Sequence, residues 1–154
     1  MGEKRRSDLD VNLQGPYSHG HWQSNDDEIL TNDTWVSRSQ QIVTQIEANL
    51  RQTYTSSALS KMTVLDIGCY DGWITNELQC RLGFEEAIGV EPRKKNIDKG
   101  VVAREALSIE TECTFIQGSL YQLKEILTER KFDVVICVGV FHHIYDHLGA
   151  MEIL

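Results

Sequence analysis

Residues 64–72 read Val-Leu-Asp-Ile-Gly-Cys-Tyr-Asp-Gly, and this stretch decides the fold. Together with Thr63, its first four residues form a short apolar and β-branched run, which predicts a buried strand over 63–67. The glycines that follow predict a tight turn. Apolar residues then recur every four positions from Ile74 to Leu82 and are followed by a glycine, so we expect a helix over 73–82.

The chain downstream repeats this alternation of strands and helices. We expect strands over 87–90, 113–117 and 133–138, and helices over 93–108, over 120–130 and from Asp146 onward. Strands that alternate with helices predict an α/β fold with a mostly parallel sheet, covered by helices on both faces. In such a fold the carboxyl ends of the strands share one edge of the sheet, where ligands bind.

Upstream of the sheet we expect two segments of different character. Apolar side chains fall at helical spacing over 34–53, which predicts a helix, and a Thr/Ser-rich linker follows it. The polar residues before it are interrupted by glycine and proline, which predicts an irregular lead-in. In that lead-in, Tyr17, His19 and Trp22 either pack over the domain or a ligand, or belong to a mobile tail. The expected division is 1–33 for the lead-in, 34–60 for the helix and linker, and 61–154 for the main domain.

The composition is that of an ordinary globular domain, with 154 residues and a net charge of −8. This acidic balance argues against a broad grip on nucleic acid, and we interpret the local basic cluster at 93–95 as a solvated helix face. Four widely spaced cysteines without a C-x-x-C pair predict free thiols and no metal site. The sequence shows neither a bilayer-spanning apolar run nor a signal-peptide pattern, so we expect a soluble, cytoplasmic protein.

The residues around the glycine turn indicate the class of ligand. Gly72 opens a helix whose free N–H groups favour an anionic group such as a carboxylate. Glu91 ends the second strand about twenty residues later, where a carboxylate can accept hydrogen bonds from both hydroxyls of a ribose. Asp66 would repel the pyrophosphate of a dinucleotide, and the spacing is Gly-x-x-x-Gly rather than G-x-G-x-x-G. A cationic nucleoside such as S-adenosylmethionine, with its sulfonium and ammonium groups, suits these acids better.

Four motifs in order resemble those of the class I S-adenosylmethionine-dependent methyltransferases. Residues 64–75 resemble the first motif, 89–91 the second, 115–119 the third, and 132–143 the fourth strand with its turn. The resemblance covers about residues 60–154 and implies S-adenosylmethionine as the cofactor. It implies a Rossmann-like, doubly wound sheet of about four strands, preceded by an N-terminal helix. That sheet is incomplete relative to the seven-stranded sheet of the family, so we interpret the chain as the N-terminal portion of a longer enzyme.

The resemblance also implies roles for individual residues. In the family, the first-motif acid and glycine turn hold the methionine part of the cofactor, the second-motif acid holds the ribose, and the third turn meets the adenine. The cofactor-binding residues so implied are Asp66, Gly68, Cys69, Tyr70, Gly72, Glu91, Pro92, Gly118, Ser119, Leu120, Gly139 and Val140. Two positions depart from the family's pattern, because Tyr70 stands where a glycine is common and Ser119 where an aspartate is common. A neutral serine accepts a hydrogen bond from the adenine more weakly than a carboxylate does.

Methyl transfer from a sulfonium is an in-line displacement, in which the protein mainly aligns the nucleophile. A base is needed only if the acceptor must lose a proton. His142 and His143 follow the fourth strand on the ligand edge and are the candidate catalytic bases, with His143 favoured. The alternative is that they pack and close the turn. Asp146 is expected to cap the next helix.

Three functions are compatible with these observations. The leading interpretation is a methyltransferase that acts on an unidentified acceptor, a small molecule rather than a nucleic acid. The second is a non-catalytic S-adenosylmethionine-binding module, and the third is an NAD-dependent oxidoreductase, which Asp66 disfavours. The apolar strand at 133–138 also predicts self-association through an exposed sheet edge, unless a partner strand covers it.

Overall fold

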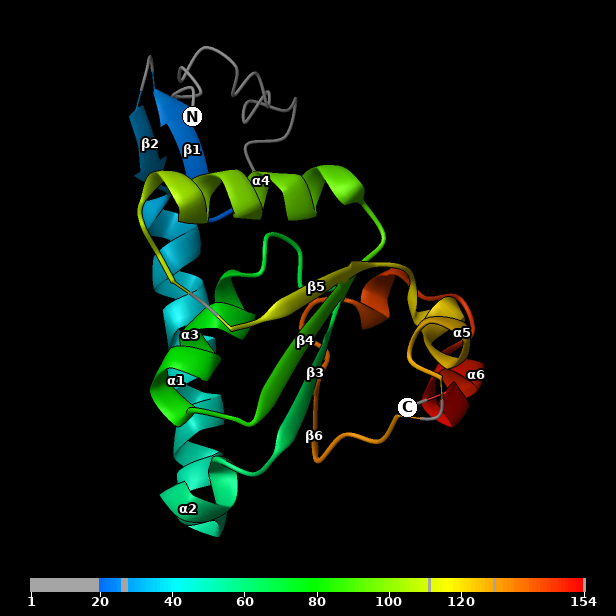
Figure 1. Ribbon diagram of the computed structural model, residues 1–154. Helices are drawn as coiled ribbons and strands as arrows, with labels where there is room; N and C mark the ends of the chain where they lie inside the picture. Colours follow the sequence, from blue (N-terminus) through cyan, green and yellow to red (C-terminus); the bar gives the residue numbers. More distant parts are fainter. Residues whose placement is uncertain (1–19, 26–27, 111, 129, 154) are drawn as a thin grey trace, which may run out of the picture.

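The computed structural model describes residues 20–25, 28–110, 112–128 and 130–153, and its centre is a four-stranded parallel sheet (Figure 1). The strands are β3 (Thr63–Ile67), β4 (Glu86–Glu91), β5 (Thr114–Gln117) and β6 (Val134–Ile136). Their order across the sheet is β5-β4-β3-β6. The chain builds outward from β3 to β5 and then returns to the other side of β3, so the strand order reverses between β3 and β6. The predicted α/β class and its parallel sheet are confirmed, and this reversal is where such folds bind ligands.

Each face of the sheet packs against its own group of helices, because successive strand side chains point to opposite faces. Val64 packs with Leu78 in one apolar cluster, on the side of the sheet covered by α1 and α3. Leu65 and Ile67 pack with Leu123 in a second cluster, on the side of α5 and α6. The helices are α1 (Asp33–Thr53), α2 (Ser56–Leu59), α3 (Trp73–Leu82), α4 (Lys94–Ala106), α5 (Leu123–Ile126) and α6 (His147–Ile153).

Most helix ends follow the local sequence, although α2 lies within the segment predicted as a Thr/Ser-rich linker. Asn32 caps α1 by accepting a hydrogen bond from the N–H of Trp35 at 3.4 Å, and Gly83 ends α3 with a φ of 62°, as predicted. The helix predicted over 120–130 is wrong in length. It is divided into a 3-10 turn, Leu120–Gln122, and the four-residue α5, and the chain leaves the helix before Thr128, whose φ is 35°. No described helix is both long and apolar enough to cross a membrane.

The N-terminal segment differs from the expected irregular lead-in. Strands β1 (Trp22–Asn25) and β2 (Glu28–Thr31) pair in an antiparallel two-stranded sheet, and the N–H of Asn32 donates to the carbonyl of His21 at 2.7 Å beside it. The polar composition concealed this pairing, because an antiparallel ladder is made by backbone groups and tolerates polar side chains. Trp22 is buried in the apolar cluster on the α1 and α3 side of the sheet. Tyr17 and His19 lie outside the described residues.

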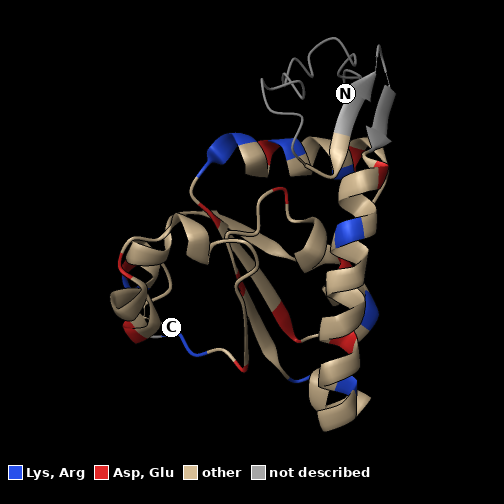
Figure 2. Cartoon of the chain, turned by 180° about the vertical axis from the view of Figure 1, so that it is seen from behind, with Lys and Arg blue, Asp and Glu red and all other residues tan. Residues whose placement is uncertain are grey.

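Charged residues recur along the longer helices. Figure 2 shows Lys and Arg interspersed with Asp and Glu along α1 and α4. Arg81 of α3 bridges Glu47 of α1 at 3.3 Å and Glu77 at 3.0 Å, and Arg51 pairs with Glu47 at 2.9 Å. The two arginines lower the pKa of Glu47, with the hydrogen bond from Arg51 as the largest cause. Such solvated pairs contribute little, so the attachment of α1 depends mainly on its apolar face.

Candidate functional site

The turn between β3 and α3 has a backbone conformation that few residues tolerate. The φ angles of Gly68, Tyr70 and Gly72 are 71°, 56° and 76°. A left-handed conformation costs a non-glycine residue about 1–3 kcal/mol, so Tyr70 is strained at a position where a glycine would not be. Contacts from the rest of the fold must therefore hold the turn in place.

The end of β4 supplies one of these contacts. The N–H groups of Gly68 and Cys69 both donate to the carbonyl oxygen of Val90, at 2.7 and 3.2 Å. At the start of α3, the N–H of Trp73 donates to Oδ1 of Asp71 at 3.3 Å. The expectation that the first amides of α3 are free for an anionic ligand is therefore wrong for Trp73.

The turns that follow β3 and β6 touch each other at the point where the strand order reverses. A Cβ atom on Gly68 would lie 2.3 Å from Cγ2 of Val140, so a side chain at position 68 would displace the second turn. Gly139 precedes Val140 with a φ of 71° and has open space around it. The structure thus brings together three residues that the sequence analysis assigned to one site.

Asp66 lies beneath the glycine turn and is almost fully buried, with 3% of its surface exposed. Its Oδ2 accepts a hydrogen bond from Oγ1 of Thr75 in α3, at 2.6 Å. Burial raises the pKa of Asp66 to about 6; the bond from Thr75 opposes this shift and the charge of Glu91 adds to it. The carboxyl group is therefore poised to gain or lose a proton according to the charge placed beside it.

Glu91 ends β4, as predicted, and lies on the same sheet face as Asp66. In the parallel register Asp66 is opposite Gly89, two residues before Glu91, so both side chains point the same way. Glu91 is buried, and its Oε1 accepts hydrogen bonds from the N–H of Arg93 at 3.1 Å and from Nδ2 of Asn96 at 2.8 Å. The start of α4 therefore fixes the orientation of this carboxylate.

The third predicted turn lies next to Glu91, because the N–H of Gly118 donates to the carbonyl of Glu91 at 3.1 Å. The hydroxyl of Ser119 donates to Oε1 of Gln122 at 3.1 Å as part of a helix cap, and Leu120 is buried in the core. The Ser119 oxygen also accepts a hydrogen bond from the backbone of Gln122, and its second lone pair can still accept one from a ligand. Pro92, between Glu91 and α4, is exposed.

Two predicted cofactor residues turn their side chains into the protein. The thiol of Cys69 packs against β4, where a Cβ on Gly89 would lie 2.7 Å from its sulfur, and burial raises its pKa. Tyr70 is partly buried and packs beside the N-terminal segment, where a Cβ on Gly20 would lie 2.9 Å from its ring. Burial also raises the pKa of Tyr70, and the charges of Asp71 and Glu91 add to this shift.

Sequence reasoning missed the partner of Asp71, the acid just before Gly72. Asp71 is 1% exposed and binds the backbone N–H and the imidazole of His21, at 2.9 and 2.7 Å. No local pattern points to this pair, because fifty positions separate the two residues in the sequence. The only signal was the presence of His21 beside Trp22 in an otherwise polar segment.

His142 and His143 lie on an exposed 3-10 turn, Phe141–His143, directly after Gly139 and Val140. Their ring centroids are 3.8 Å apart, and the N–H of His143 donates to the carbonyl of Val140 at 2.9 Å. The turn is therefore closed by backbone bonding, which leaves both imidazoles accessible. Asp146 caps α6 through a bond from the N–H of Gly149 to its Oδ1 at 2.9 Å, as expected.

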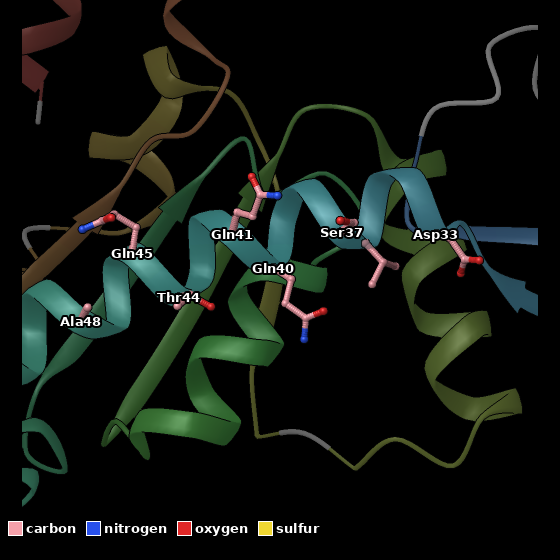
Figure 3. A pocket seen from close by; sticks show the side chains of 8 residues that line it. Asp33, Ser37, Gln40, Gln41, Thr44, Gln45 and Ala48 are labelled. Carbon is pink, nitrogen blue, oxygen red and sulfur yellow. The ribbon is translucent and has the colours of Figure 1, made fainter.

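A hollow of about 550 Å³ lies elsewhere, along the outward face of α1 (Figure 3). Its lining residues all come from this single helix, without an opposing wall in the described part of the chain. It contains none of the residues at the carboxyl edge of the sheet, so we do not regard it as the ligand site. The lining residues are Asp33, Val36, Ser37, Gln40, Gln41, Thr44, Gln45 and Ala48.

The strand order, the glycine turn at the reversal and the acid ending the neighbouring strand define an α/β domain of the nucleotide-binding kind. Residues 58–154 match the methyltransferase domain family, and the chain belongs to this family. All four motifs that resemble those of class I methyltransferases lie within the matched residues.

Individual relatives agree with this assignment. The chain is 34% identical over 96 residues to an uncharacterized methyltransferase of Schizosaccharomyces pombe, covering 57% of this chain and 33% of that protein. It is 32% identical over 104 residues to the ubiquinone biosynthesis O-methyltransferase of Bradyrhizobium diazoefficiens, covering 66% and 36%. The magnesium protoporphyrin IX methyltransferase of Synechocystis PCC 6803 with bound SAH has a TM-score of 0.56 and 26% identity, covering 81% and 51%. The chain thus spans about a third of the length of the two curated relatives.

The raised pKa of Asp66 predicts a pH dependence of stability. Between about pH 4 and pH 6 the unfolded chain loses this proton while the folded chain retains it, so the free energy of unfolding falls as the pH rises. This fall in the free energy of unfolding is on the order of 3 kcal/mol, and it is complete above about pH 7. Asp66→Asn does not titrate and should lose this fall, as measured by urea unfolding from pH 4 to pH 7. The exposed control Glu105→Gln should follow the wild type, whereas parallel profiles of wild type and Asp66→Asn would refute the assignment.

Proposed function

We propose that the chain binds S-adenosylmethionine at the carboxyl edge of its sheet and forms the cofactor-binding part of a methyltransferase. The observation that carries this proposal is the meeting of the glycine turn, Glu91 and the Gly139–Val140 turn beside the reversal of strand order. Membership of the methyltransferase domain family supports it. The SAH bound to the Synechocystis relative supports the choice of ligand.

The acids of the site fit a cationic nucleoside. Both hydrogen bonds to the side chain of Glu91 go to Oε1, so Oε2 receives none from the described residues and is available to a ribose hydroxyl. A sulfonium or ammonium near Asp66 would favour its charged form and offset the cost of burying it. Asp66 would also repel a pyrophosphate, which disfavours a nicotinamide dinucleotide.

Bound S-adenosylmethionine supplies the activated methyl group, and the protein holds and aligns the reacting groups. Gly68 and Gly72 would let the methionine part approach the backbone, while Glu91 would orient the ribose. The Gly118–Leu120 turn would border the adenine, and Gly139 and Val140 would line the cofactor from the other side of β3. Fixing these parts converts transfer to a bound acceptor into an effectively unimolecular step.

Calorimetry with S-adenosylhomocysteine tests this proposal. The wild type should bind it and should not bind NAD. Glu91→Gln removes the charge that strengthens the hydrogen bonds to the ribose, so the affinity for S-adenosylhomocysteine should fall about 10- to 100-fold. This range corresponds to the loss of about 1.5–3 kcal/mol that is typical of a hydrogen bond to a charged group. The exposed Glu85→Gln is the matched control and should bind as the wild type does. Binding of NAD without binding of S-adenosylhomocysteine would overturn the proposal.

We propose His143 as the base that accepts a proton from a small-molecule acceptor where the reaction requires it. Its support is its exposed position after β6, next to the turn that would line the cofactor. The name of the Bradyrhizobium relative makes hydroxylated aromatic compounds suitable trial acceptors.

His143→Asn should lower methyl transfer to such a phenol about 100-fold or more while leaving the affinity for S-adenosylhomocysteine unchanged. Transfer is measured with a radiolabelled methyl group, and binding by calorimetry. His142→Asn is the neighbouring comparison and should lower transfer less. Unchanged transfer by His143→Asn would exclude it as the base.

We further propose that the chain self-associates through β6, which is an edge strand of the described sheet. Val135 in this strand is 41% exposed, and an apolar strand edge offers unpaired backbone groups to a second copy. Light scattering should therefore show oligomers of the wild type, and Val135→Lys should reduce them. Val101→Lys, at a similarly exposed position on α4, should not. A stable wild-type monomer at high concentration would contradict this proposal.

A further inference from the structure

Three distant segments meet at the imidazole of His21. The N–H and Nδ1 of His21 bind the two oxygens of the Asp71 carboxylate, at 2.9 Å to Oδ2 and 2.7 Å to Oδ1. On the other side of the ring, Nε2 lies 2.7 Å from Oγ of Ser39 in α1. A carboxylate only accepts hydrogen bonds, so Nδ1 carries a proton and donates it to Asp71, while Nε2 shares a hydrogen bond with the hydroxyl of Ser39. The segment before β1 is thus tied to the glycine turn and to α1 at once.

The order Ser39–His21–Asp71 is that of a nucleophilic triad, but the surroundings exclude that chemistry. Ser39 is 5% exposed on the core side of α1, and His21 is 4% exposed. The imidazole is stacked on Trp73, with ring centroids 4.9 Å apart, and meets the edge of Trp35 at 6.1 Å. A nucleophile must reach a substrate, and this hydroxyl faces protein instead. The network therefore acts on the fold and not on a substrate of its own.

Asp71 is the residue through which this network reaches the candidate cofactor site. It stands between Tyr70 and Gly72, both of which have left-handed backbone conformations. Its carbonyl oxygen accepts a hydrogen bond from Nη1 of Arg104 at 3.0 Å, and a Cβ on Gly100 would collide with that oxygen. The turn is therefore held from α4 through the carbonyl of Asp71 and from the N-terminal segment through its carboxylate.

We propose that His21 is a positioning residue for the cofactor site, which acts through Asp71 to keep the Gly68–Gly72 turn in its binding conformation. The strain at Tyr70 gives the turn a reason to relax when this support is removed. His21 does not touch the ligand in this role. The segment before β1 supports the ligand site from outside the residues that match the family. This inference rests on the proposed binding of S-adenosylmethionine by the same turn.

Two amide substitutions separate the two ends of the imidazole. The side-chain amide of His21→Asn can replace Nδ1 as donor to Asp71 but cannot reach Ser39. His21→Gln places its amide near the position of Nε2 and removes the donor that Nδ1 supplies to Asp71. Ser39→Ala is the structural control, because it removes the outer hydrogen bond and leaves the pair of His21 and Asp71 intact.

Calorimetry with S-adenosylhomocysteine, at a temperature where circular dichroism shows every variant folded, gives the first test. His21→Gln should weaken binding about tenfold or more, while His21→Asn and Ser39→Ala should stay within about threefold of the wild type. Urea unfolding should show that Ser39→Ala and His21→Gln both lose stability. Equal affinities of all variants, or an equal loss of affinity in Ser39→Ala, would overturn the proposal, since only a general loss of stability would remain.

Amide hydrogen exchange of the ligand-free chain gives a second test that does not depend on the cofactor. Exchange at residues 68–73 should accelerate about tenfold in His21→Gln and not in Ser39→Ala. If the wild type fails to bind S-adenosylhomocysteine, the proposed function fails, and exchange still decides whether His21 holds the turn. Unchanged exchange in His21→Gln would overturn the inference even if the wild type binds the cofactor.

Discussion

The double hydrogen bond to the carbonyl of Val90 is the interaction on which the arrangement of the carboxyl edge depends. This carbonyl accepts hydrogen bonds from the N–H groups of Gly68 and Cys69, so the turn after β3 is held at the end of β4. Glu91 follows Val90 directly and is therefore always presented beside this turn. Since β6 lies on the other side of β3, the Gly139–Val140 turn completes the site from the opposite direction. One backbone acceptor thus positions groups from separate parts of the chain.

The charged side chains around this edge form two groups with different functions. Asp66 and Glu91 lie on one sheet face, and the charge of Glu91 adds to the raised pKa of Asp66, an effect that a cationic ligand would oppose. Asp71 faces the N-terminal segment, and its carboxylate is satisfied by His21 within the protein. Arg104 lies nearby over the ring of Phe115, at 4.4 Å, and burial lowers its pKa although the charge of Asp71 opposes the shift. Asp71 therefore supports the turn from within the protein.

Local patterns predicted most of the main fold because each describes a single element. Apolar runs marked β3 to β6, and helical spacing marked α1, α3 and α4 close to their observed ends. The prediction was wrong where backbone pairing outweighed side-chain character, as in the hairpin of β1 and β2. It was also wrong over 120–130, where the capped 3-10 turn after Ser119 leaves only four residues in α5.

The sequence by itself determined the order of strands and helices, the glycines that allow the turns, and the acid at the end of β4. These features depend on spacing and on backbone preferences within a few residues, so they can be recognised without a structure. Only the tertiary structure decided that Gly68 meets Val140, that Cys69 points into the protein, and that Asp71 belongs to His21. The reason is physical: hydrogen bonds and packing across many positions in the chain depend on where the folded elements place their side chains. The periodicity of the sequence does not predict that placement.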